Sequence, residues 1–316
     1  MIELPFFTQL NEGQRILLAG AGGGFDIFCG LPLYFSLKEA GKEVFLANLS
    51  FSFLPPIGEE RLDPNLLRVT TDTPLFGEYF PEKFLADWFL ANENETVPLY
   101  CFERTGVRPL QQAYETLITH LDIDTVVLVD GGTDSLMRGD EDGLGTPAED
   151  IASITAVHKL TIPRKMLVCL GFSVDRFHGV SNELSLAAIA ELTRQAGFLG
   201  NFSLLEQMSS VQKYKAATEY VFQQMPNDIS IVSSSILSAL AGNYGDHHAT
   251  RRTLGSKLWI NPLMTNYWCF NLCHIAERIL YLDLIKDTED FMELRGLIKA
   301  FWREQAPFQR RHSIPD

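Results

Sequence analysis

The segment from Val129 to Asp150, VDGGTDSLMRGDEDGLGTPAED, concentrates residue types that bind cations. It holds seven acids, five glycines and one base, Arg138. Carboxylate oxygens are ligands that Mg²⁺ and Mn²⁺ prefer, and glycines allow the backbone to turn tightly around a bound group. We therefore predict Asp130 and Asp134 as metal ligands. The residues predicted to contact a ligand in this segment are Gly131, Gly132, Thr133 and Asp134.

Other roles remain open for the acids of this segment. They could bind sugar hydroxyls or supply a general base. Asp140, Glu141 and Asp142 fit a solvated acidic loop equally well. The residues TPAE at 146–149 predict the start of a helix, with Thr146 as its cap and the glutamate completing a capping box.

A second glycine-rich stretch, LLAGAGGGFD at 17–26, lies between an apolar run and a predicted helix. Glycines in such a turn let the backbone approach a phosphate, and a helix N-terminus favours the anion. Asp26 either caps this helix or faces the ligand. The residues predicted to contact the phosphate are Gly20, Gly22, Gly23 and Gly24.

This stretch departs from the fingerprint of dinucleotide-binding proteins. The pattern G-x-G-x-x-G is broken, because Phe25 stands where the last glycine is needed. The second predicted strand ends near Asn48, not on the Asp or Glu that binds a ribose in NAD-binding folds. We therefore favour a nucleotide or phosphorylated sugar as the ligand, and NAD is the alternative cofactor.

Two further polar stretches supply candidate acid/base residues. In LVCLGFSVDRFHG, Asp175 and His178 follow a predicted strand, but the stretch lacks the final glycine of a serine nucleophile elbow. In GNYGDHHAT, His247 lies between Asp246 and His248, and imidazoles beside a carboxylate are good ligand chemistry. Our catalytic candidates are Asp175, His178 and His247. The alternative for the first two is that they only shape their loop.

Apolar runs alternate with helical patterns along most of the chain. This alternation predicts an α/β fold with a doubly wound, mostly parallel, Rossmann-like sheet. Strands are expected at 14–19, 43–49, 97–102, 125–129, 165–171 and 228–232. Helices are expected between the glycine turn and about residue 40, and at 110–121, 146–160 and 182–196. We treat residues 1–316 as one α/β domain, with an excursion over about 51–95 and a mainly helical C-terminal portion over about 266–305.

Composition limits the classes of partner. The formal net charge of −14 argues against nucleic acid, because duplex binding depends on Lys and Arg at phosphates. No uncharged apolar run reaches the roughly 20 residues of a membrane span, and the N-terminal residues lack the pattern of a signal peptide. Five scattered cysteines fit a reducing cytoplasm. The sequence leaves a homo-oligomer open.

Three blocks together carry a resemblance to a known family. GAGGGFD, DGGTDSLMRGDEDGLGTPAEDI and LGFSVDRFHGVSNELS resemble the uncharacterised family catalogued as domain of unknown function 1152, with similarity over nearly the whole chain. This resemblance implies a single α/β unit and assigns no catalytic roles. GAGGGFDIFCGLP also resembles, more weakly, the glycine turn of sirtuin-type NAD-binding folds, although Leu33 and Tyr34 follow the proline where that family carries charged residues.

These observations favour a cytoplasmic enzyme that binds a nucleotide or a phosphorylated sugar and catalyses hydrolysis or group transfer. A divalent cation, Mg²⁺ or Mn²⁺, is an expected cofactor because carboxylates and glycine turns recur after successive predicted strands. Two alternatives stay open. One is an enzyme that binds an NAD-type cofactor, and the other is a ligand-sensing or assembly protein without catalysis.

Overall fold

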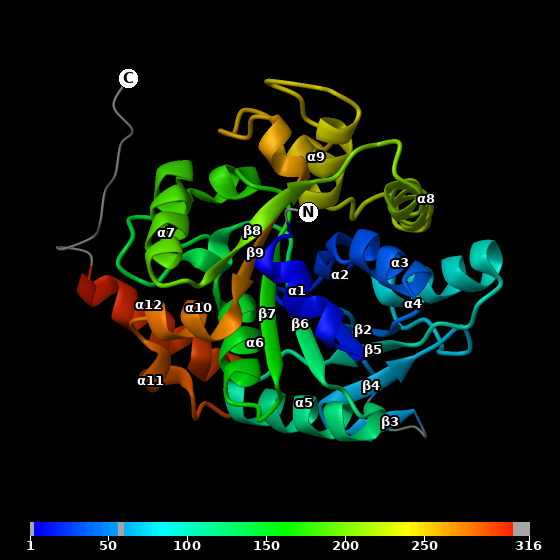
Figure 1. Ribbon diagram of the computed structural model, residues 1–316, viewed down its shortest axis with the longest axis horizontal. Helices are drawn as coiled ribbons and strands as arrows, with labels where there is room; N and C mark the ends of the chain where they lie inside the picture. The colour runs from blue at the N-terminus through cyan, green and yellow to red at the C-terminus, as the bar shows by residue number, and fades with distance from the viewer. Residues whose placement is uncertain (1–2, 56–59, 306–316) are drawn as a thin grey trace.

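The computed structural model describes residues 3–55 and 60–305, and all of its named strands belong to one nine-stranded sheet (Figure 1). The strand order is β3-β4-β5-β2-β1-β6-β7-β9-β8. The five central strands are β5 (Leu99–Phe102), β2 (Glu43–Leu49), β1 (Arg15–Gly20), β6 (Thr125–Asp130) and β7 (Arg164–Cys169). They are parallel to one another. The predicted α/β, doubly wound, mostly parallel fold is therefore confirmed.

Antiparallel strands extend both edges of this parallel core. β3 (Arg61–Asp63) and β4 (Leu66–Val69) lie beside β5, and β9 (Asn266–Asn271) and β8 (Phe198–Ser203) lie beside β7. The chain runs from β1 through β2 to β5 on one side, and then from β6 to β7 on the other side of β1. The strand order therefore reverses between β1 and β6, and ligands of open α/β sheets bind outside the carboxyl ends of strands at such a point.

Helices cover both faces of the sheet (Figure 1). Alternating side chains of β6 show why: Val126 and Leu128 enter one buried apolar cluster, while Val127 and Val129 enter the other. One face is packed by α5 (Val107–Leu121), α6 (Ala148–His158), α7 (Asn182–Arg194), α10 (Leu272–Arg278), α11 (Leu282–Ile285) and α12 (Phe291–Gln305). The other is packed by α1 (Pro5–Glu12), α2 (Asp26–Cys29), α3 (Leu31–Glu39), α4 (Pro81–Trp88), α8 (Ser209–Gln224) and α9 (Ile231–Leu240).

The mainly helical C-terminal portion was predicted to begin too early. Residues 266–271 form β9, and α10 starts at Leu272. Tyr267 and Cys269 pack on one face of the sheet, while Trp268 and Phe270 pack on the other. A strand buried on both faces reads as a continuous apolar run, which periodicity cannot distinguish from a buried helix.

Two local predictions were also wrong. Residues 228–232 form no strand, because Ser230 caps α9 by accepting a hydrogen bond from the amide of Ser233 (3.1 Å). Thr146 does not cap α6: its amide and hydroxyl donate to Asp134 (2.9 and 3.4 Å), and the helix begins at Ala148 without a side-chain cap. The excursion over 51–95 contains β3, β4, α4 and a π-helix at Phe89–Glu93.

No helix within the described ranges 3–55 and 60–305 combines the length and apolar character needed to cross a membrane. The prediction that residues 1–316 form a single domain stays a prediction.

Candidate cation and ligand site

A cleft of about 990 Å³ lies where β1, β6 and β7 end. The turn after β1 contributes Gly22 and Gly23, and β6 contributes Asp130 at its last position. The loop that follows β7 contributes Asp175. The cleft therefore occupies the crevice between β1 and β6 in which doubly wound folds bind their ligands.

Three carboxylates converge on the floor of this cleft. Asp26 opens α2, Asp130 ends β6 and Asp150 lies in the first turn of α6, and one carboxylate oxygen from each lies within 4.8 Å of the other two. Asp150 is only 4% exposed, and its Oδ1 has no hydrogen-bond partner among the described residues. A buried carboxylate oxygen without a donor is destabilising, and a hard cation would satisfy it.

Hydrogen bonds fix the other carboxyls of the cleft in place. Asp26 accepts from the amides of Gly22 (2.6 Å) and Gly131 (3.3 Å). Asp175 accepts from the amide of Thr133 (2.6 Å). Asp130 accepts a short hydrogen bond from the hydroxyl of Ser135. The loop amides and the Ser135 hydroxyl thus hold these three acids in position at the cleft.

Burial and mutual repulsion make these carboxyls hard to ionise. Burial raises the pKa of Asp26 to about 8, and the neighbouring charges of Asp134 and Asp175 add to the effect. Burial, followed by repulsion from nearby aspartates, also raises the pKa of Asp130, Asp150 and Asp175 well above the usual value for a carboxyl. A cation among them would remove this repulsion, which is the ordinary reason for such a cluster.

The glycines of the two predicted stretches are needed for contact with these acids. A Cβ added to any of four glycines would lie 2.5 to 2.8 Å from a carboxylate oxygen. The pairs are Gly22 with Asp150, Gly131 with Asp26, Gly132 with Asp175, and Gly145 with Asp134. Real Cβ atoms do not approach so closely. The acids and glycines therefore occur together because each of these carboxyls packs directly against a glycine backbone.

The lining of the cleft also carries positive charge. Arg104, from the loop between β5 and α5, lies over the rings of Phe51 (5.4 Å) and Phe291 (4.9 Å) and forms an ion pair with Glu149 (3.6 Å). α12 adds Arg295 and Lys299. A cleft lined by both acids and bases suits a ligand that carries both a cation and anionic oxygens.

A smaller cavity of about 450 Å³ adjoins the cleft and shares Asp26, Phe51 and His178 with it. Gly23 and Gly24 line this cavity together with Tyr79. Partial burial lowers the pKa of His178 below its usual 6.5, against an opposing effect of Asp134. The imidazole of His178 is therefore neutral at pH 7 and able to accept a proton from a group in either cavity.

The structure unites most of the predicted residues but leaves four of them outside both cavities: Gly20, Gly132, Thr133 and His247. Asp175 and His178 both line the cleft, but no side-chain hydrogen bond joins them among the described residues. Gly20 is the last residue of β1, packed against Asn48, and it lines neither cavity. His247 is exposed on the loop after α9 and lines neither cavity, while its neighbours Asp246 and His248 pair with each other (2.7 Å).

Two acids of the loop hold the loop itself together. Glu141 is fully buried and accepts from the amides of Arg138 (3.0 Å) and Gly139 (2.8 Å). Asp140 forms an ion pair with the Arg138 guanidinium (3.2 Å). The interpretation of these residues as a solvated acidic loop is wrong for Glu141, whereas Asp142 is exposed and lines the cleft.

Sequence reasoning missed Asp150 as a site residue, and it missed Arg104, Arg295 and Lys299 altogether. Asp150 had a usable signal, since it follows the acidic loop and lies in the first turn of a predicted helix. The three bases had none, because they come from segments far from the glycine turns along the chain.

Fold and site define a doubly wound α/β protein with an acidic cleft at its topological switch point. The family described as "Protein of unknown function (DUF1152)" matches residues 86–301, and the chain belongs to this family. The resemblance predicted from the sequence is confirmed over a shorter range, which includes the second and third blocks but not GAGGGFD. Curated proteins and solved structures gave no significant match, and the likeness to sirtuin-type folds is not shown.

Proposed function

We propose that this chain is an enzyme that uses a divalent cation, Mg²⁺ or Mn²⁺, to bind a nucleotide or phosphorylated sugar and to hydrolyse it or transfer a group from it. The observation that carries this proposal is the convergence of Asp26, Asp130 and Asp150 within 4.8 Å in the cleft. Oxygen-only ligands favour these hard cations over zinc or copper. Bound there, the cation would neutralise phosphate oxygens and polarise the bond to be broken.

The charge distribution supports a phosphorylated ligand. Arg104, Arg295 and Lys299 line the same cleft as the three carboxylates. Mg²⁺ in proteins is commonly held by one or two carboxylates together with substrate phosphates, and arginine binds phosphate through paired hydrogen bonds. The cleft volume of about 990 Å³ is at the upper end of the range for small-molecule sites. We place the protein in the cytoplasm, because its five cysteines are free.

Cation binding tests the proposal directly. We expect electron paramagnetic resonance titration to detect Mn²⁺ bound to the wild type. Asp130→Asn and Asp150→Asn should each weaken the Mn²⁺ affinity at least about tenfold, because even the loss of a residue that only supports a metal ligand has an effect of this size. Saturating cation, at about 100 times its Kd, should stabilise the fold by ~2.7 kcal/mol. Asp246→Asn and His247→Ala, which change the loop outside both cavities, are the matched controls.

If the wild type binds no Mn²⁺ or Mg²⁺, or if the cleft variants bind the ion as well as the controls do, the cation proposal fails. The same purified protein separates the alternatives. Binding of NAD⁺ at millimolar concentration without any need for a cation would favour an enzyme with an NAD-type cofactor. The buried Asn48 at the end of β2 and Phe25 in the glycine turn argue against that alternative. Tight binding of a phosphorylated compound without any product by mass spectrometry would indicate a sensing protein.

His178 is our candidate general base. For a compound that the protein turns over, we expect kcat/KM of the wild type to fall as the pH drops through the lowered pKa of the His178 imidazole, at a pH below that of an ordinary histidine. His178→Gln should lower turnover by about 10²- to 10⁴-fold and remove this acid limb, because glutamine cannot accept the proton. Mn²⁺ affinity should be unchanged. Persistence of the acid limb in the variant would assign the base to another residue.

A further inference from the structure

Gly296 is the only glycine within any α-helix that the structure describes. Glycine is the least favourable residue in a helix interior apart from proline, so its presence in the middle of α12 needs a reason. Packing gives none: a Cβ added at Gly296 would meet no atom within 4 Å, and the backbone there is not in the left-handed region. The space beside Gly296 is instead part of the large cleft.

One face of α12 forms the wall of that cleft. Arg295, Gly296, Lys299 and Trp302 line it, at the spacing of successive turns on one side of a helix. Arg295 and Lys299 are exposed, and neither forms an ion pair with any residue within 3–55 or 60–305. Two cations therefore flank an open strip of helix backbone in the lining of the cleft that holds the carboxylate cluster.

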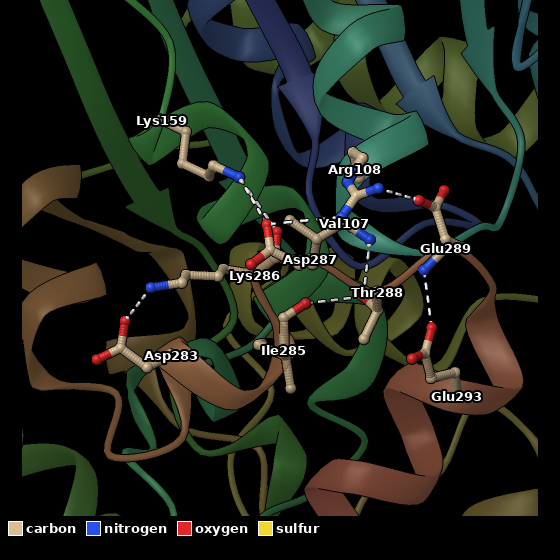
Figure 2. A network of polar contacts seen from close by, with 10 residues as sticks. All are labelled: Val107, Arg108, Lys159, Asp283, Ile285, Lys286, Asp287, Thr288, Glu289 and Glu293. Carbon is tan, nitrogen blue, oxygen red and sulfur yellow. Dashed lines mark hydrogen bonds and ion pairs between the residues drawn. The ribbon is translucent and has the colours of Figure 1, made fainter.

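The chain before α12 is fixed in position by a network of polar contacts (Figure 2). Thr288 is buried; its hydroxyl accepts from the amide of Val107 (3.0 Å) and donates to the carbonyl of Ile285 (2.8 Å). Glu289 forms an ion pair with Arg108, and its amide donates to Glu293 inside α12 (2.8 Å). The network thus joins the first turn of α12 to the start of α5.

The other end of α12 is attached to the acidic loop. The indole nitrogen of Trp302 donates to the carbonyl of Glu141 (2.9 Å), and Phe301 packs against Tyr281 (5.4 Å between ring centroids). Held at both ends, the helix presents Gly296 to the cleft in a constant position. A site built on such a wall needs no ordering of the backbone when a ligand binds.

We propose that a phosphoryl group of the ligand lies against the backbone of α12 at Gly296, between Arg295 and Lys299, and that this position is glycine because any side chain would occupy the phosphoryl site. This inference rests on the proposed function for the identity of the ligand, and it adds where the anionic part binds. The side chains of Arg295 and Lys299 would donate hydrogen bonds to the phosphoryl oxygens. The absent side chain at Gly296 would leave room for them.

Substitution at Gly296 should change stability and binding in opposite directions. We expect Gly296→Ala to raise the melting temperature by about 2 °C, since alanine favours the helix. Gly296→Leu should weaken the binding of inorganic phosphate and of pyrophosphate, measured by calorimetry with Mn²⁺ present, by more than about tenfold, equal to 1.4 kcal/mol. Arg295→Gln and Lys299→Gln should each weaken the same binding. Mn²⁺ affinity should be unchanged in all four variants.

Ala300→Leu is the matched control, because it places the same leucine side chain at an exposed position of α12 that does not line the cleft. We expect it to bind phosphate and pyrophosphate as the wild type does. Wild-type phosphate affinity in Gly296→Leu, with Mn²⁺ binding intact, would overturn this inference and leave the proposed function standing. A wild type that binds Mn²⁺ but neither phosphate probe would also overturn it. A wild type that binds no Mn²⁺ would instead contradict the proposed function.

Discussion

Stripping divalent cations with a chelator is expected to make the free energy of unfolding fall as the pH rises from 5 to 7. Each carboxyl that stays protonated in the folded state should contribute about 1.4 kcal/mol of loss per pH unit. Asp26 is one such group, since burial raises its pKa from 3.8 to about 8 in the folded protein. Asp130 and Asp150 are raised in the same direction by the same cause.

The sign follows from the proton balance. Between pH 3.8 and about 8 the folded state holds a proton on Asp26 that the unfolded state has released. Raising the pH therefore favours the unfolded state, and the stability contributed by the protonated carboxyl is complete below 3.8 and lost above about 8. Most proteins show the opposite trend over acidic pH, because their carboxyls are easier to ionise when folded.

Saturating Mg²⁺ or Mn²⁺ should flatten this dependence, because the cation replaces the protons among the carboxylates. The measurement is urea unfolding at several pH values, with chelator and with cation. Asp150→Asn should reduce the pH dependence in chelator, since it removes one repelling carboxylate from the cluster. Stability that rises from pH 5 to 7 in the chelated wild type would show that the clustered carboxyls ionise freely without a cation.

Gly22→Val should have the second large effect, on the cation site and on folding together. Its Cβ would lie 2.6 Å from both carboxylate oxygens of Asp150, so the carboxylate must move out of the cluster. We expect a loss of about 1–3 kcal/mol in the free energy of unfolding, typical of overpacking. Mn²⁺ affinity should fall by about 100-fold or more, the upper loss seen when the surroundings of a metal are disturbed.

Gly197→Val is the matched control for this substitution. Gly197 is also tightly packed, with an added Cβ 2.7 Å from the Cβ of His274, and it lies outside both cavities. The control should lose a comparable amount of stability, seen in the same urea titrations, while it keeps its Mn²⁺ affinity. Equal losses of Mn²⁺ affinity in the two folded variants would mean that Gly22 acts only through the general stability of the protein.

The sequence alone determined the parallel core and the general location of the site. Five of the predicted strands appear as β1, β2, β5, β6 and β7 with bounds shifted by no more than two residues. They are buried on both faces, so their apolar runs are continuous and easy to recognise. Glycine turns and acids directly after β1 and β6 could be assigned to one edge of the sheet, because parallel strands end on the same side.

Only the tertiary structure decided which acids meet. Asp134 was predicted as a metal ligand together with Asp130, whereas the acids that lie within 4.8 Å of one another are Asp26, Asp130 and Asp150. Asp134 instead accepts hydrogen bonds from Thr146. Asp26 and Asp150 are separated along the chain by five strands, β2 to β6, and by helices α3, α4 and α5. Only the packing of these elements brings α6 to the turn after β1. A local pattern cannot encode such a contact.

The positive wall was also decided by packing alone. In the sequence, Arg295 and Lys299 are ordinary charges on an amphipathic helix, which most often face solvent. The contacts of Thr288 and Glu289 with the start of α5 turn this helix so that its polar face meets the cleft. Gly296 lies between those charges, and from the sequence alone it indicates only a residue that lowers the stability of the helix. Its proposed role depends on an acidic cluster contributed by residues more than a hundred positions earlier, which three-dimensional packing brings into the same cleft.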